Sequence, residues 1–135
     1  TADTWAQEAY VKSSNLRPGD LFGADVQLSA DGNVMAVAGL LEDSRATGVG
    51  GDQADDLAPD AGAVYVFRRA GNAWSQQAYV KAPNTHADDR FGSIALSADA
   101  STMAVGAWVE SSHSAGVGGD QTDLSAPGAG AVYLY

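Results

Sequence analysis

The sequence predicts an all-β protein made of two tandem repeats. Residues 5–12, Trp-Ala-Gln-Glu-Ala-Tyr-Val-Lys, return almost unchanged at 74–81, and the glycine-rich segment 48–53 returns at 116–121. A spacing of about 69 residues, falling to about 68 in the second half, is typical of a repeat architecture. Short apolar stretches alternate with clusters of Gly, Asp, Asn, Ser and Pro, and helical periodicity is missing, which favours strands joined by turns. We place the repeats at 1–67 and 68–135.

Each repeat contains four candidate strands in the same order. The first repeat predicts strands at 5–12, 22–29, 34–39 and 62–68, and the second at 73–81, 91–97, 102–108 and 130–135. Residues 35–38 and 64–67 are apolar at every position, as expected for a sheet that is covered on both faces. Small alanines and glycines in these strands predict that neighbouring sheets approach closely, with aromatic rings filling the remaining space.

Two kinds of connection join the predicted strands. The segments 29–32 and 97–100 are short turns, in which Asp offers an acceptor to the backbone. The segments 41–61 and 109–129 are long loops, each with Gly-Val-Gly-Gly-Asp-Gln at its centre. Loops of this length are usually functional or disordered, so they are the first place to look for a ligand.

Composition excludes several classes of partner. The net charge of −10 argues against nucleic acid and anionic membranes, because either would need a basic surface. No apolar run approaches the roughly 18 residues of a membrane span, so no membrane insertion is predicted. With no cysteine, neither disulfides nor a thiolate metal site can form. No signal peptide opens the chain, and we expect an exported, extracellular or cell-surface protein whose signal was removed, or an excised piece.

The acidic long loops are the only candidate cofactor site. Oxygen ligands on glycine-rich loops suit Ca²⁺, and the candidate ligands are Asp43, Asp52, Asp55, Asp120 and Asp123. However, exposed like charges about 4 Å apart repel by only about 1 kcal/mol in water, so such a cluster is tolerated without a metal. The spacing matches no standard calcium loop, and both interpretations stay open.

No catalytic constellation is recognisable, so the chain is not expected to be an enzyme. The Gly48–Gly51 run lacks the Lys-Ser or Lys-Thr of a phosphate loop. His86 and His113 occupy different repeat positions, which suggests neither a zinc pair nor a catalytic dyad. Trp108 stands where the first repeat has Leu40; it would either stack on a sugar or be buried between sheets.

The order of these elements resembles the FG-GAP repeats of bacterial secreted proteins and of the integrin α-subunit β-propeller. The matching motifs are Asp20-Leu21-Phe22-Gly23, 35–39 and 62–67 in the first repeat, and Asp89-Arg90-Phe91-Gly92, 103–107 and 130–133 in the second. The resemblance covers nearly the whole chain and implies β-propeller blades of four antiparallel strands around a central axis, with Phe22 and Phe91 wedged between blades. Trp5 and Trp74 recur in register, so Trp74 is expected in the structural core. Two family features are missing: the proline of the motif's second half, and the calcium loop of alternating Asp and Asn between the first two strands.

In propeller phase, the chain holds an outer strand, one complete blade and three strands of a second. An unpaired strand edge is a template for association, and the predicted self-association residues are Trp5, Tyr10, Val11, Val132, Tyr133 and Tyr135. Strand sharing with another chain would complete the blades. Roughly three or four chains would close a ring of six or eight blades, and a non-closing contact would grow a filament.

These observations predict a non-catalytic, extracellular structural or adhesive module whose partner is itself. Two alternatives stay open. One is a carbohydrate-binding lectin with sites between the blades of an oligomeric propeller, whose partners would be glycans or cell-surface proteins. The other is an excised fragment of a larger integrin-like propeller.

Overall fold

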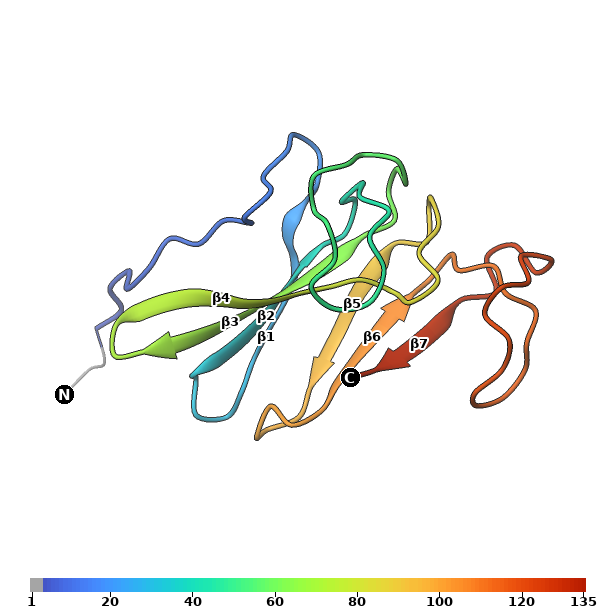
Figure 1. Cartoon of the computed structure of the whole chain (residues 1–135). Helices are drawn as coiled ribbons and strands as arrows, with labels where there is room; N and C mark the ends of the chain where they lie inside the picture. The colour runs from blue at the N-terminus through green and yellow to red at the C-terminus, as the bar shows by residue number, and fades with distance from the viewer. Residues whose placement is uncertain (1–3) are drawn as a thin grey trace.

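The computed structural model describes residues 4–135 and contains two antiparallel β-sheets (Figure 1). The four-stranded sheet has the order β1-β2-β3-β4, and the three-stranded sheet has the order β5-β6-β7. The strands are β1 (Phe22–Leu28), β2 (Val34–Gly39), β3 (Ala63–Ala70), β4 (Ala73–Val80), β5 (Phe91–Leu96), β6 (Met103–Ala107) and β7 (Ala131–Leu134). The all-β prediction and seven of the predicted strands are therefore confirmed. Within the described range, no helix has the length and apolar character needed to cross a membrane.

The predicted strand at 5–12 is wrong. This segment runs as irregular chain without a backbone hydrogen bond to the rest of the described residues. Its sequence copy, β4, pairs with β3 along its whole length, for example Tyr79 opposite Tyr65. The same residues thus form a strand where a neighbouring edge is available and remain unpaired where it is not, since strand formation depends on context more than on intrinsic propensity.

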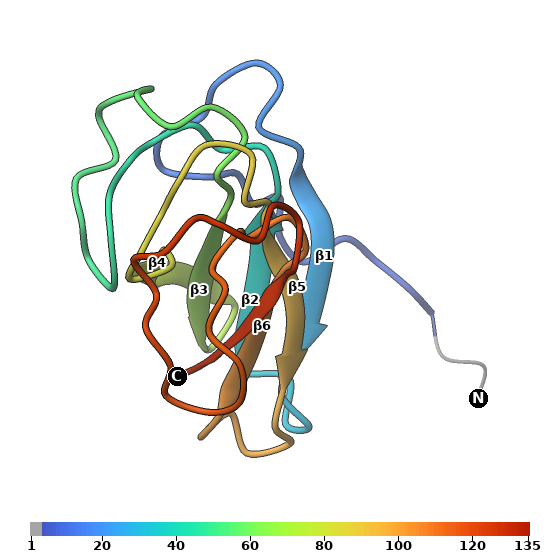
Figure 2. The same cartoon turned by 90° about the vertical axis from the view of Figure 1, so that its right-hand side faces the viewer.

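The two sheets pack against each other and enclose the main core (Figure 2). Ala36 and Ala38 of β2 are fully buried there and face Phe91 of β5 and Val105 of β6. A methyl group added to Gly92 of β5 would lie 3.1 Å from the Ala38 Cβ, so the small residues do set a close approach. The predicted sheet-on-sheet arrangement is therefore found on this face.

The opposite face of the four-stranded sheet carries a second apolar cluster. Val37, Tyr65, Phe67 and Tyr79 are buried in it, and the Phe22 ring meets Tyr65 edge-on at 5.3 Å between centroids. Val11 and Trp74 pack against its rim and are only partly buried. Of the residues expected in the structural core, Phe91 is fully buried, whereas Phe22 and Trp74 are at the edge of this second cluster.

Backbone geometry explains the one-residue difference between the repeats. β1 bulges between Phe22 and Val26, and β5 has a shorter bulge between Phe91 and Ser93. The larger bulge brings the Asp25 carboxylate to the second sheet, where its Oδ2 accepts a hydrogen bond from the Ile94 amide at 2.7 Å. The two sheets are therefore joined by a side-chain bond as well as by apolar packing.

Candidate functional site

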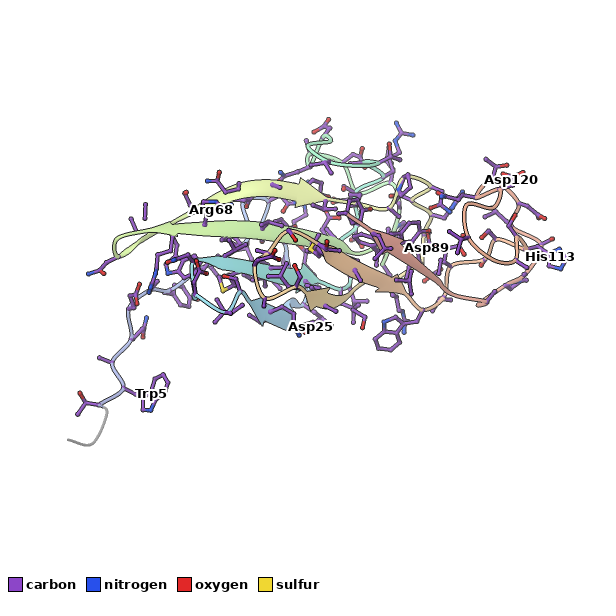
Figure 3. All side chains as sticks on the ribbon, turned by 90° about the horizontal axis from the view of Figure 1, so that it is seen from below. Trp5, Asp25, Arg68, Asp89, His113 and Asp120 are labelled. Atoms are coloured by element: carbon purple, nitrogen blue, oxygen red, sulfur yellow. The ribbon has the colours of Figure 1, made fainter. Side chains whose placement is uncertain are left out.

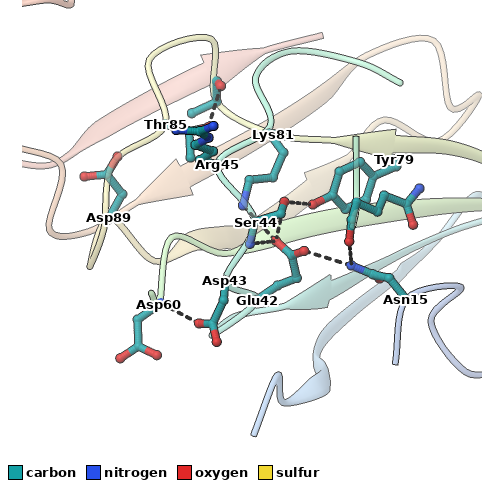
Figure 4. A network of polar contacts seen from close by, with 12 residues as sticks. Asn15, Glu42, Asp43, Ser44, Arg45, Asp60, Tyr79, Lys81, Thr85 and Asp89 are labelled. Carbon is teal, nitrogen blue, oxygen red and sulfur yellow. Dashed lines mark hydrogen bonds and ion pairs between the residues drawn. The ribbon is translucent and has the colours of Figure 1, made fainter. Parts of the chain in front are cut away.

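A buried network of polar side chains lies at the end of the first sheet (Figure 4). The Lys81 ammonium, which is 0 % exposed, lies 2.8 Å from Oε2 of Glu42, which is 2 % exposed. Ser44 donates to the same carboxylate oxygen from its amide and its hydroxyl, both at 3.2 Å, and its Oγ also bonds the Tyr79 hydroxyl. Asn15 donates to Oε1 of Glu42 at 2.8 Å. Both carboxylate oxygens are thus paired.

The electrostatics of this network depend on the ion pair. Burial lowers the pKa of Lys81, and the adjacent Glu42 carboxylate opposes that shift by favouring the ammonium. Burial likewise raises the pKa of the Tyr65 and Tyr79 phenols, which therefore act as neutral hydrogen-bonding groups. Removing one charge of a buried pair leaves the other without compensation, so the lysine and the glutamate are required together.

The second repeat holds the same network without its lysine. Glu110 is 1 % exposed; its Oε1 accepts from Asn84 at 2.9 Å and its Oε2 from Ser112 at 3.0 Å. The Tyr133 hydroxyl donates to Oδ1 of Asn84 at 2.6 Å. In the first repeat, the Tyr65 hydroxyl donates to Oδ1 of Asn15 at the same distance. Among residues 4–135, no cation forms an ion pair with the Glu110 carboxylate.

In the second repeat, the place that corresponds to Lys81 and Tyr79 of the first repeat is open. In the first repeat, β4 ends beneath the long loop: the Lys81 amide donates to Gly48 O at 2.8 Å, and the Gly50 amide donates to Tyr79 O at 2.9 Å. In the second repeat, the corresponding loop segment 116–118 is exposed, and its Gly116 and Gly118 line a hollow of about 550 Å³ together with Ser112 and Tyr133. The outer edge of β7 borders this hollow, and no strand among the described residues pairs with it.

Segment 4–12 carries the residues that the hollow lacks. Its Lys12 and Tyr10 occupy the repeat positions of Lys81 and Tyr79, but Tyr10 is 80 % exposed and Lys12 is exposed too. The only side-chain polar contact between this segment and other described residues is an exposed ion pair, Glu8 with Arg69 at 3.0 Å. Figure 3 shows Trp5 at the opposite end of the molecule from Asp120 and His113 of the second long loop.

The chain after Lys12 already has the conformation that follows β4. Asp20 accepts a hydrogen bond from the Arg17 amide at 3.1 Å, and Asp89 accepts one from the His86 amide at 2.8 Å. Both carboxyls are buried, which raises the pKa of each, and in each the backbone bond opposes that shift. Segment 13–21 is therefore held in place as its counterpart 82–90 is.

The predicted self-association residues separate into two groups. Trp5, Tyr10 and Val132 are exposed, and Val132 belongs to the edge strand β7. Val11 is partly buried. Tyr133 is instead buried between the sheets. Tyr135 packs edge-on against Phe91 at 6.2 Å between centroids, and its hydroxyl donates to the Lys81 carbonyl.

The structure does not bring the five candidate calcium ligands together. No group of three or more acidic or histidine side chains suited to a metal occurs in residues 4–135. Their carboxylates instead accept backbone hydrogen bonds within the long loops; Asp52, for example, accepts from the Ala54 amide at 2.9 Å, and Asp43 from the Asp60 amide at 2.8 Å. The loop acidity therefore has a structural use, and calcium binding stays a prediction without a described site.

Trp108 is exposed beside a shallow hollow of about 440 Å³ next to β7. Its counterpart Leu40 lies against Gly92 of the second sheet, as shown by the 3.3 Å between Leu40 Cδ1 and a Cβ built on that glycine. The aromatic ring thus occupies a position that is packed between sheets in the first repeat and uncovered in the second.

Sequence reasoning missed the Glu42 and Glu110 networks. The signal was present, because Asn15 and Asn84, Glu42 and Glu110, and Ser44 and Ser112 recur in register. Polar residues that recur at the ends of apolar strands are candidates for a buried network rather than for a solvated turn.

Comparison of the chain with family models, curated proteins and solved structures gives no match.

Proposed function

We propose that this chain is a non-catalytic interaction module that associates with itself by packing the second sheet of one copy onto the first sheet of the next, as successive blades of a β-propeller. The observation that carries the proposal is a pair of unfilled surfaces. The second sheet has a free face and a free edge at β7, and on the outer face of the first sheet Val26 and Leu28 of β1 are exposed beside the second apolar cluster. The module would serve in a structural or adhesive, extracellular setting.

The repeat itself supports the match between these two surfaces. In the core, β3 residues Val64 and Val66 pack toward the second sheet. Their counterparts Val132 and Leu134 are 71 % and 73 % exposed. On the first sheet, Val26 and Leu28 are exposed, whereas their counterparts Ile94 and Leu96 are buried and partly buried. A head-to-tail contact would place these residues in the environments that their counterparts already have.

Burial at this contact would be substantial. Full burial of a large apolar side chain contributes about 1.5–3 kcal/mol, and Val132, Leu134, Val26 and Leu28 are each about half exposed or more. Releasing segment 4–12 breaks the exposed Glu8–Arg69 ion pair, which contributes about 0–1 kcal/mol, and the partial packing of Val11 against the second apolar cluster. This apolar burial favours association and acts against the translational and rotational freedom that two chains lose when they bind.

Solution mass measured by light scattering over a dilution series tests the proposal. A discrete species of roughly three or four copies indicates a closed ring, and growth with concentration indicates a filament. A chain that stays monomeric at all concentrations refutes self-association and supports a piece of a larger protein.

The exposure of Trp108 favours one second candidate function, carbohydrate binding. An exposed indole beside a hollow can stack on a sugar ring, as aromatic side chains combine apolar area with a polar edge. Glycan-array binding that is lost in Trp108→Ala would support this candidate. In a chain with Trp5→Phe and Trp74→Phe, so that Trp108 is the remaining indole, quenching and a blue shift of its fluorescence on self-association, without any glycan bound, would support packing between copies instead.

A further inference from the structure

We infer that residues 4–12 of a second copy pair with the free edge of β7 as a fourth strand, with Lys12 of that copy completing the buried site around Glu110. This inference rests on the proposed self-association and names the contact that drives it. The first repeat provides the template, because β4 stands in the same relation to β3 and to Glu42.

The register follows from the pairing of β3 with β4. Val64 lies opposite Val80, Tyr65 opposite Tyr79, and Val66 opposite Ala78. The second copy therefore places Val11 opposite Val132, Tyr10 opposite Tyr133, and Ala9 opposite Leu134. This pairing satisfies the outer edge of β7 by antiparallel strand addition, in which backbone hydrogen bonds supply affinity and alternate side chains supply specificity.

The polar contacts follow from the same template. Lys12 Nζ reaches the Glu110 carboxylate as Lys81 reaches Glu42, and the Tyr10 hydroxyl bonds Ser112 as Tyr79 bonds Ser44. The exposed loop segment 116–118 then closes over the incoming strand, as the segment 48–50 does over β4. Three features that look unrelated in one copy have one explanation: an exposed lysine, a buried glutamate without a cation, and an open loop.

The donor segment cannot easily reach the acceptor site of its own chain. The blue N-terminal segment and β7 lie on opposite sides of the molecule in Figure 1, with the first sheet between them. Segment 13–21 is also fixed to the first sheet, because Asn15 donates to Glu42 and the Asp20 carbonyl accepts a hydrogen bond from the Leu41 amide. The contact is thus head-to-tail between copies and repeats the joint between the two sheets inside one chain.

Lys12→Met tests the charge pair. Lys12 is exposed in the single chain, so at a concentration where the chain is monomeric the variant is expected to melt at the unchanged temperature. Its dissociation constant for self-association should rise about 30-fold or more, because truncating one partner of a buried charge pair weakens binding to this degree. Arg68→Met, which removes an exposed cation from β3, is the matched control and should leave association unchanged. Glu110→Gln should weaken association as Lys12→Met does without lowering the stability of the single chain.

Disulfide trapping tests the register, and the natural absence of cysteine makes it clean. Directly opposed residues on antiparallel strands have Cβ atoms about 4.5–5.5 Å apart, near enough for a disulfide to form with slight adjustment. A mixture of Val11→Cys and Val132→Cys chains should form a mixed disulfide dimer under mild oxidation. A mixture of Val11→Cys and Asn72→Cys chains, whose second cysteine lies in the exposed turn between β3 and β4, should not.

The outcomes separate the two proposals. Association of the unchanged chain with no effect of Lys12→Met and no Val11–Val132 disulfide overturns this inference and leaves self-association standing through another contact. A chain that is monomeric at every concentration overturns both.

Discussion

Lys81→Met is expected to be one of the most damaging single substitutions in this chain. Methionine keeps much of the apolar stem of lysine, so the main change is the loss of the ammonium 2.8 Å from the Glu42 carboxylate. Glu42 keeps Asn15 and Ser44 as donors but is only 2 % exposed, so water cannot replace the cation. Breaking a buried pair in this way costs about 3–5 kcal/mol, a large part of the roughly 5–15 kcal/mol that stabilises a typical domain.

Urea denaturation followed by circular dichroism measures this loss, at a concentration where the chain is monomeric. The double variant Glu42→Gln/Lys81→Met should recover part of the stability, because no buried charge is then left without a partner. Arg68→Met is the control and should change the free energy of unfolding by less than about 0.5 kcal/mol, as exposed substitutions usually do. A loss below about 1 kcal/mol for Lys81→Met, or strictly additive effects in the double variant, would refute the reasoning.

Four further outcomes are expected. Trp74→Ala should lower the free energy of unfolding by about 1–2 kcal/mol rather than the 3–5 kcal/mol of a core tryptophan, because Trp74 is only partly buried. Calorimetry at neutral pH measures this difference. Gly62→Ala should lower the free energy of unfolding clearly more than Gly71→Ala. At both positions the positive φ costs an alanine about 1–2 kcal/mol, but only at Gly62 would the new Cβ lie 2.3 Å from the backbone of β5. Hydrogen bonds lower the pKa of Asp31 and Asp99 to about 2, so they stabilise the fold above pH 4 and this contribution is lost as pH falls toward 2. A chain with both changed to Asn should therefore lose less stability than the unchanged chain between pH 4 and 2. Millimolar Ca²⁺ should leave the melting temperature unchanged, because the structure does not bring the five candidate ligands together, and a clear rise would support calcium binding by the long loops.

The strands inside each repeat could be predicted because their apolar pattern and their turns are local. The fate of segment 4–12 could not, because its sequence is nearly that of β4 and only the presence of a neighbouring edge separates the two. Strand pairing is a property of two segments, so a single segment does not contain the answer.

The candidate site shows the same limit. Lys81 and Glu42 are 39 residues apart in the chain, and nothing local to either predicts that the loop carries the glutamate beneath the end of β4. Comparison of the repeats could have indicated the network, because its asparagine, glutamate and serine all recur. The missing lysine of the second repeat becomes visible only when the geometry of the first is known.

The longer bulge of β1 has a consequence for how an assembly of these chains would respond to force. Inside one chain, Asp25 ties the first sheet to the Ile94 amide of the second. At the joint between copies the corresponding position belongs to the shorter bulge of β5, which has Ser93 and no such aspartate. Joints within and between chains would then alternate in strength, so a pulled ring or fibre should part at chain boundaries and release intact subunits that can reassemble.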